Sequence, residues 1–128
     1  MGRLSWVSVG VLILACVTGC VIVAPQSTEE QVRQRAQARW DALVAGNVEG
    51  AYALLSPGAR QARSLPAYRA MIKAGFWKRA VVDRVECQSS ETCKVMVMVE
   101  YVYRGTLISS PIFEDWVLAD QRWWAAAG

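Results

Sequence analysis

Histidine is absent from all 128 residues of this chain. The commonest metal ligand in proteins and the commonest general base at neutral pH are therefore both missing. Cysteine does not replace them, because Cys87 and Cys93 alone cannot fill a tetrahedral zinc site within one chain. We expect neither a metal nor a cofactor.

Blocks of basic residues are missing as well. Lysine and arginine number 14 against 11 aspartates and glutamates, so the formal net charge is only +3. No basic segment with interleaved aromatic residues is present, which disfavours nucleic acid as a partner. The chain also lacks an internal repeat and a low-complexity tract, and its length suits one compact domain.

The first 19 residues have the pattern of a secretory signal peptide. Arg3 is followed by an uncharged apolar stretch over residues 4–15 and then by small residues. The run Val17-Thr18-Gly19-Cys20 resembles the lipobox of bacterial lipoproteins, in which the cysteine is acylated and becomes the first residue of the mature protein. The resemblance implies a signal peptide over residues 1–19, acyl chains such as palmitate on Cys20, and a membrane tether over residues 20–27.

Two alternatives to that processing remain open. An uncleaved helix over residues 4–24 would be long enough to span roughly 30 Å of hydrocarbon, and Cys16 offers a second cleavage register. The small residues before Cys20 favour acylation there, whereas bulky Leu14 fits the Cys16 register poorly. Because Val21 follows the cysteine instead of aspartate, the sorting pattern of bacterial lipoproteins implies an outer-membrane protein that faces the periplasm.

Cys87 and Cys93 flank a polar run, residues 88–92, between two segments that have strand character. This spacing and an oxidising periplasm favour a disulfide across the base of a hairpin. A redox-active pair is normally closer in sequence, as Cys-x-x-Cys at the start of a helix. A disulfide that closes a loop this short contributes only about 2 kcal/mol to stability.

Helical periodicity is confined to the first half of the chain. Thr28 and Gln31 match a capping box at the start of a helix. An apolar stripe follows at helical spacing: Val32, Ala36, Trp40, Leu43 and Val44. Helices are expected over residues 28–45, 48–55 and 64–73, ended by Gly46-Asn47, Ser56-Pro57-Gly58 and Gly75.

The second half changes to a period of two. Strands are expected over residues 80–87, 93–103, 106–110, 112–119 and 123–126, with Phe76 and Trp77 in the preceding loop. Helices followed by an antiparallel meander are typical of the α+β class. The sequence therefore predicts one domain over residues 28–128, with its helices on one face of a curved sheet.

Two segments carry a resemblance to a known family. The run from Trp40 to Asn47 with residues 51–57, and the ending over residues 115–124, resemble nuclear-transport-factor-two-like cone domains, also called cystatin-like. The resemblance covers residues 28 to 126 and extends to small bacterial lipoproteins with this fold. It implies a cone-shaped α+β domain. Isomerases, dehydratases, ligand-binding modules and interaction domains all share this fold, so the fold does not select a function.

The function we predict is a membrane-anchored periplasmic module that binds a small apolar ligand or an envelope protein. Two interpretations of the aromatic residues remain open. They line the mouth of a cone and hold an apolar ligand, or they fill a small core, which the periodic apolar setting of Trp40 and Trp116 favours.

Met96 and Met98 make a second face of one strand apolar, opposite Val95, Val97 and Val99. Three interpretations remain open: a homodimer through the sheet, a cover by another envelope protein, or ordinary surface methionines. The candidate pocket or interface residues are Trp77, Tyr101, Tyr103, Met96, Met98 and Trp116.

The alternative is a small isomerase-type enzyme that uses a buried carboxylate in the cone pocket. Relatives of ketosteroid isomerase place a carboxylate base in an apolar cone, near a tyrosine. Candidate carboxylates are Asp83, Glu100, Glu114 and Asp115, and candidate phenols are Tyr68, Tyr101 and Tyr103. A competing interpretation pairs these acids with Arg84, Arg104 or Lys94 across strands, at roughly 0.2–1 kcal/mol each. A dehydratase that relies on a His–Asp pair cannot be built from this chain.

Overall fold

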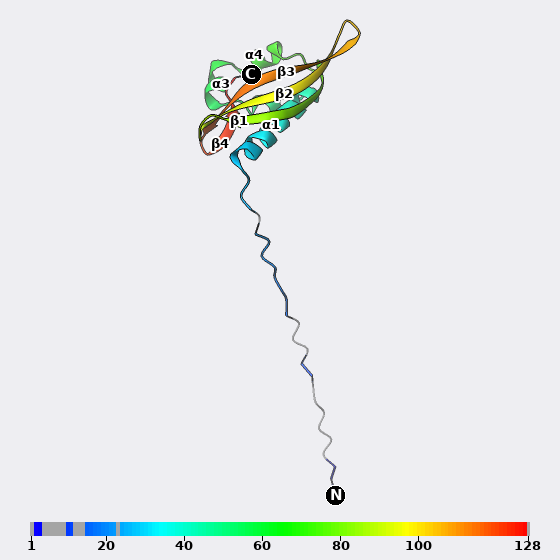
Figure 1. Cartoon of the computed structure of the whole chain (residues 1–128), viewed down its shortest axis with the longest axis vertical. Helices are drawn as coiled ribbons and strands as arrows, with labels where there is room; N and C mark the ends of the chain where they lie inside the picture. Colours follow the sequence, from blue (N-terminus) through cyan, green and yellow to red (C-terminus); the bar gives the residue numbers. More distant parts are fainter. Residues whose placement is uncertain (1, 4–9, 12–14, 23, 128) are drawn as a thin grey trace.

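The computed structural model describes residues 2–3, 10–11, 15–22 and 24–127. Within these residues, four helices are followed by four strands (Figure 1). The helices are α1 (Thr28–Val44), α2 (Val48–Tyr52), α3 (Pro57–Ala62) and α4 (Leu65–Met71), and the strands are β1 (Trp77–Cys87), β2 (Thr92–Tyr103), β3 (Thr106–Ala119) and β4 (Arg122–Ala125). The strands form one antiparallel sheet in the order β1-β2-β3-β4. The predicted α+β class is confirmed.

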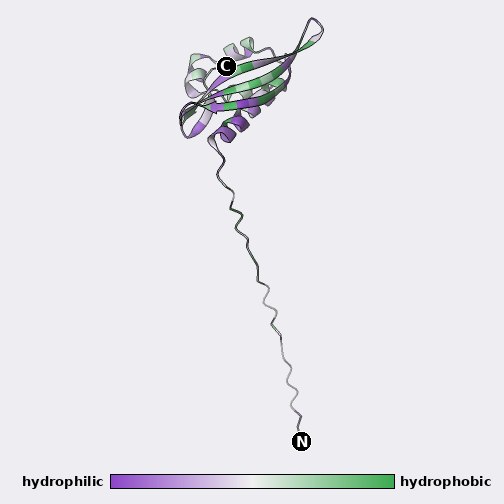
Figure 2. Cartoon of the chain, in the orientation of Figure 1, coloured by the Kyte–Doolittle hydropathy of each residue, from purple (hydrophilic) through white to green (hydrophobic). Residues whose placement is uncertain are grey.

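Helix α1 lies along one face of the sheet and packs chiefly against β1 (Figure 1). Its N-cap is Ser27, whose Oγ accepts a hydrogen bond from the Glu30 amide at 3.2 Å. The cap is therefore the residue before Thr28, because Ser27 has the extended backbone that a cap requires. Figure 2 shows hydrophilic residues on the exposed turns of α1, while its other side faces the sheet.

The prediction of a helix over residues 48–55 was wrong at its end. Helix α2 stops at Tyr52, and Leu55 instead forms an isolated parallel bridge with Ala125 of β4. Ser56 and Pro57 do not only break a helix; they start α3, which was not predicted. The Ser56 Oγ accepts from the Ala59 amide at 3.1 Å, and proline is favourable at the first helical position, where its missing N–H would lack a partner anyway.

Two strand predictions also need correction. The segments expected over 106–110 and 112–119 are one continuous strand, β3, in which Pro111 pairs with Met98. Proline is tolerated there because β4 pairs only with residues 116–119 of β3, so Pro111 has a free edge on its other side. Trp77, predicted in a loop, begins β1 and pairs with Tyr101.

The core lies between α1 and the inner face of the sheet. On β2, Val95, Val97 and Val99 are fully buried, while Met96 and Met98 between them are half-buried on the outer face. The remaining large core side chains come from both halves of the chain: Val32, Trp40, Leu43, Leu55, Tyr68, Trp116 and Trp123. The two-residue alternation of the strand thus places one apolar set against the helices and leaves the other uncovered.

The predicted disulfide is present. Cys87 and Cys93 are bonded, and they are register partners at the end of the β1–β2 hairpin. Cys16 and Cys20 are exposed and unpaired. Most of the apolar stretch predicted over residues 4–15 lies outside the described residues. In the part of the chain that the structure does describe, no helix has the length and apolar character needed to cross a bilayer.

Candidate functional site

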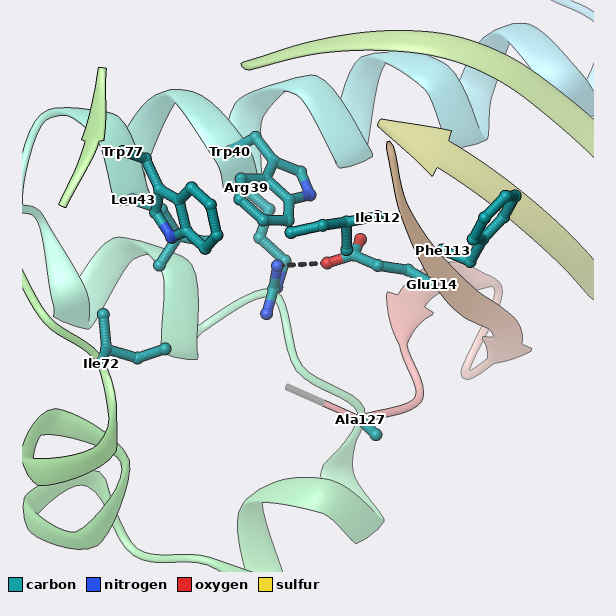
Figure 3. A pocket seen from close by; sticks show the side chains of 9 residues that line it. All are labelled: Arg39, Trp40, Leu43, Ile72, Trp77, Ile112, Phe113, Glu114 and Ala127. Atoms are coloured by element: carbon teal, nitrogen blue, oxygen red, sulfur yellow. Dashed lines mark hydrogen bonds and ion pairs between the residues drawn. The ribbon is translucent and has the colours of Figure 1, made fainter. Parts of the chain in front are cut away.

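A cavity of about 310 Å³ opens between the C-terminal part of α1, the segment before β1, and β3 (Figure 3). Its walls are mostly apolar, with one arginine and one glutamate. The lining residues are Arg39, Trp40, Leu43, Ile72, Trp77, Ile112, Phe113, Glu114 and Ala127. This volume is at the lower end of the range of small-molecule sites in proteins.

An ion pair forms the polar part of the cavity wall. Arg39 Nη1 donates to Glu114 Oε1 at 2.5 Å, and the two side chains are only 3% and 7% exposed. Figure 3 shows them pointing toward each other, Arg39 from α1 and Glu114 from β3. Because an isolated buried charge is strongly unfavourable, each residue needs the other to remain in this position.

The pair belongs to a longer hydrogen-bond network. The second carboxylate oxygen, Glu114 Oε2, accepts from Trp116 Nε1 at 3.1 Å. On the other side, Arg39 Nη2 donates to the Tyr68 hydroxyl at 3.3 Å. Tyr68 and Trp116 are both fully buried. The network thereby joins α1, α4 and β3, and both oxygens of Glu114 are engaged as acceptors.

Burial sets the protonation of the phenol in this network. Removal from water raises the pKa of Tyr68 above its ordinary value of 10.0, the charge of Glu114 adds to the rise, and the charge of Arg39 opposes it. Tyr68 is therefore a neutral hydroxyl at physiological pH, and it can accept from Arg39 while keeping its own proton.

Two donors of the cavity residues have no acceptor. Arg39 Nε and Trp40 Nε1 are buried and make no hydrogen bond within the described protein. A buried N–H without a partner costs about 1–3 kcal/mol. The buried polar groups of Arg39 and Trp40 that lack a partner are therefore N–H donors. Both acceptor oxygens of Glu114, in contrast, already accept hydrogen bonds. Both N–H groups lie below the surface of the cavity wall, so an occupant would need a shift of the lining side chains to offer an acceptor to either one.

The structure distributes the predicted pocket or interface residues over four places. Trp77 lines the cavity, and Tyr101 packs on Trp77 with ring centroids 5.7 Å apart. Trp116 is in the core beneath the cavity, where it donates to Glu114. Tyr103 lies exposed near the tip of the β2–β3 hairpin. The remaining two, Met96 and Met98, lie on the outer face of the sheet, away from the cavity.

Among the four candidate carboxylates, Glu114 alone lines this cavity. Asp115 pairs with Lys94 of β2 at 3.2 Å, as the cross-strand interpretation expected. Glu100 pairs with Arg79 at 3.8 Å. Asp83 is exposed. Within the described residues, no three acidic or cysteine side chains are grouped as metal ligands.

Arg39 was missed at the level of the sequence. A charged residue is normally assigned to the exposed side of a helix, and the apolar stripe of α1 was described without it. Its spacing carried a signal, because positions 32, 36, 39 and 43 follow one another at intervals of four and three and so share one helix face. An arginine inside such a stripe indicates a buried partner.

Comparison with known proteins shows which solved structures share this fold. No protein-family model and no curated protein matches the chain. Among solved structures, the chain is similar to a SEC-C motif containing protein from Psychrobacter arcticus, with a TM-score of 0.63 and 14% identity over 77% of this chain. The chain spans only 59% of the length of that protein.

Two further similar structures are described as NTF2-like proteins of unknown function. The one from Shewanella oneidensis MR-1 matches with a TM-score of 0.59 and 10% identity, over 77% of this chain and 93% of its own. The one from Prochlorococcus marinus matches with a TM-score of 0.51 and 14% identity, over 80% of this chain and 90% of its own. At these identities the matches show the NTF2-like fold alone.

Proposed function

We propose that this protein is a ligand-binding module held at a bacterial envelope membrane, and that its cavity takes a small apolar molecule carrying a hydrogen-bond acceptor. The observation that supports this most directly is the cavity itself. It combines apolar walls with two lining residues, Arg39 and Trp40, that each have a buried N–H without an acceptor. Ligand sites typically pair an apolar lining with a few polar groups that orient the ligand.

The charge of the cavity wall further restricts the class of ligand that can bind. Glu114 compensates the charge of Arg39 at 2.5 Å, so the wall is neutral as a whole. A carboxylate ligand would compete with Glu114 for the guanidinium and leave one negative charge without compensation in a buried site. We therefore expect a neutral acceptor, such as the oxygen of a ketone, ester, amide or ether, on an apolar body of modest size.

Attachment to the membrane is the second part of the proposal. The lipobox-like run that ends at Cys20 supports acylation there, and residues 20–27 form the tether because α1 is capped by Ser27. Fully extended, this tether spans roughly 25–30 Å. The disulfide of the domain fits an oxidising compartment. A short tether keeps the domain close to apolar molecules dissolved in or released from the bilayer.

Identification of bound molecules tests the binding proposal. Ile72 lies half-buried on the cavity wall and makes no polar contact with Arg39 or Glu114, so Ile72→Trp should fill the cavity without breaking the ion pair. The matched control is Leu118→Trp, the same kind of enlargement at an exposed position of β3 that lies outside the cavity lining. Each protein is purified from membranes, extracted with organic solvent, and compared by mass spectrometry.

We expect the wild type and Leu118→Trp to yield the same neutral, acceptor-bearing compound, and Ile72→Trp to yield at least tenfold less of it. Equal recovery from all three proteins would place the molecule outside the cavity. An anionic compound in the wild type would contradict the argument from charge. In both cases the melting temperature of Ile72→Trp shows whether the domain is still folded.

The enzymatic alternative has one specific observation in its favour. Glu114 is a buried carboxylate on the wall of the cavity, the residue type that a proton-transferring isomerase requires. However, both of its oxygens already accept hydrogen bonds, from Arg39 and Trp116, which favours binding over catalysis. Incubation of the recovered compound with wild type and with Glu114→Gln separates the two functions, because only an enzyme converts it and loses that conversion in the variant.

The outer face of the sheet supports a further proposal, a homodimer or a contact with an envelope protein. Met96 and Met98 lie there, and Phe113, the register partner of Met96, is 63% exposed. Sedimentation of the wild type and Met98→Lys distinguishes these cases. A concentration-dependent dimer that the lysine abolishes would support self-association through this face.

A further inference from the structure

A second unusual surface lies where the β2–β3 hairpin projects beyond the rest of the domain (Figure 1). We refer to residues 72–80 and 100–108 together as the hairpin end. Four of its large apolar side chains are exposed: Phe76 is 38%, Val102 47%, Tyr103 55% and Leu107 60% exposed. Scattered apolar residues are ordinary on a protein surface, but a group at one projecting end indicates a site of interaction.

The same end carries the excess charge of the protein. It contains the four cations Lys73, Lys78, Arg79 and Arg104 against one carboxylate, Glu100. Its net charge of +3 equals that of the whole chain, so the remaining residues balance one another. Arg79 lies 3.8 Å from Glu100. The positive charge of this end is therefore complementary to an anionic surface.

The tip of the hairpin places a cation at a conformationally demanding position. Arg104 and Gly105 form the turn, with φ angles of 49° and 78°. Asparagine, aspartate or glycine normally occupies the first of these positions, since a longer side chain at positive φ is disfavoured. The guanidinium of Arg104 lies 5.4 Å from the centre of the Tyr103 ring. Fold stability alone would favour another residue here.

We propose that the hairpin end inserts into the interfacial layer of an anionic phospholipid bilayer. Tyr103 lies two residues beyond Tyr101, the last residue paired with β1, and this corresponds to about 7 Å along an extended strand. Interfacial segments bury their apolar side chains to a depth of about 5–10 Å. Tyrosine suits this layer, and Arg104, with the lysines behind the tip, would meet the phosphate groups.

A protein partner fits this end less well. A stable protein interface needs about 800 Å² on each side, whereas the projecting part is a narrow two-stranded finger with three apolar side chains, Val102, Tyr103 and Leu107, and a cation at its tip. A fluid surface that closes around the finger needs no complementary shape. The ring of Phe76 stacks on Tyr101 at 5.1 Å and extends the apolar surface toward the body of the domain.

The hairpin end is also connected to the cavity. Trp77 lines the cavity and contacts Phe76 and Tyr101 edge to face, with ring centroids 4.7 and 5.7 Å apart. Insertion of the hairpin would therefore bring the cavity close to the source of apolar molecules. The insertion itself does not depend on the proposed ligand-binding function, and its test does not use a ligand.

Photo-cross-linking to lipid acyl chains tests the insertion. The full chain is reconstituted into vesicles of equimolar phosphatidylglycerol and phosphatidylcholine with a trace of a phospholipid that carries a diazirine in its acyl chain, and in parallel into vesicles of phosphatidylcholine alone. Cross-linked residues are located by mass spectrometry. The internal control is another exposed turn of the sheet, residues 88–91 between β1 and β2.

We expect cross-links at residues 102–107 and not at residues 88–91, with a higher yield in the anionic vesicles. Arg104→Gln should lower the yield about fivefold, the factor for one cation at an anionic surface. Leu107→Gln should lower it about tenfold, because a largely exposed leucine loses its burial in lipid. Both positions are exposed, so the melting temperature should not change.

Three results would overturn the proposal. Cross-linking of residues 102–107 no stronger than that of residues 88–91 would exclude insertion. Equal yields in the two kinds of vesicle would exclude recognition of anionic lipid. Variants at Arg104 and Leu107 with unchanged yields would assign this end to another partner.

Discussion

Removal of the charge at position 39 gives the sharpest test of how this domain is held together. Arg39→Met keeps the length and much of the apolar volume of the side chain but deletes the guanidinium. Glu114, only 7% exposed, would then keep a single donor, Trp116 Nε1, and the Tyr68 hydroxyl would lose its contact with Arg39. The variant therefore leaves a buried carboxylate without an opposite charge.

Breaking a buried ion pair by removing one partner costs about 3–5 kcal/mol. A domain of this size has a total stability of only about 5–15 kcal/mol, so Arg39→Met should lose a large part of its free energy of unfolding. The double variant Arg39→Met with Glu114→Gln removes both charges and keeps an acceptor for Trp116. We expect it to regain about 2 kcal/mol of the loss, since a neutral buried pair avoids the desolvation of a lone charge.

Urea denaturation followed by tryptophan fluorescence measures these differences, on a chain that begins at Ala24 so that the cap at Ser27 is kept. Lys94→Met is the matched control. It breaks the pair of Lys94 with Asp115, which is the neighbour of Glu114 on β3, but both of these side chains are largely exposed. An exposed pair of this kind contributes less than about 1 kcal/mol.

If Arg39→Met lowers the free energy of unfolding no more than Lys94→Met does, the buried ion pair does not stabilise the domain as inferred. A double variant that is less stable than the single one would also contradict the inference, because the buried carboxylate would then not be the cause of the loss. If Arg39→Met does not fold at all, the double variant still decides the matter, since only the charge argument predicts that a second substitution restores folding.

Three further outcomes are expected. Cys87→Ser should lower the free energy of unfolding by about 2 kcal/mol, because the bond closes a loop with a sequence separation of only 6; the same loss under reducing agent, and none in the variant, would confirm the cause. The raised pKa of Tyr68 means that stability is fully present below its unfolded value of 10.0 and falls as the pH rises further, so Tyr68→Phe should show a weaker alkaline loss in urea titrations. Cys20→Ala should abolish incorporation of labelled palmitate into the protein, whereas Cys16→Ala should not; the reverse result would move the acylation site.

Prediction from the sequence succeeded where a pattern is local. The alternation of Val95, Val97 and Val99 with Lys94, Met96, Met98 and Glu100 was enough to predict β2, and the spacing of Cys87 and Cys93 was enough to predict the hairpin disulfide. It failed where an element depends on what lies beside it. The pattern predicts that a strand ends at Pro111. Because this part of β3 has no strand on its other edge, the missing N–H of Pro111 breaks no hydrogen bond, and the strand continues through it.

The candidate site divides in the same way. Trp77 was expected near a pocket and lines it, and Glu114 was one of four candidate carboxylates. No local signal could show that Glu114, and not its neighbour Asp115, faces the cavity. The difference is one of strand register, because successive residues of a strand point to opposite faces of the sheet.

Local patterning was enough to predict that helices precede an antiparallel meander. Apolar residues repeat about every 3.6 positions in the first half of the chain and every two positions in the second half, and both repeats are visible over a few adjacent residues. The sequence by itself could not determine that Arg39 is buried, since burial of a charge depends on a partner that lies 75 residues away in the chain. Only the packing of α1 on the sheet brings that guanidinium to Glu114 and leaves the donors of Arg39 and Trp40 without acceptors beside the cavity. The chemistry of the site therefore results from tertiary contacts, while the fold class follows from local order.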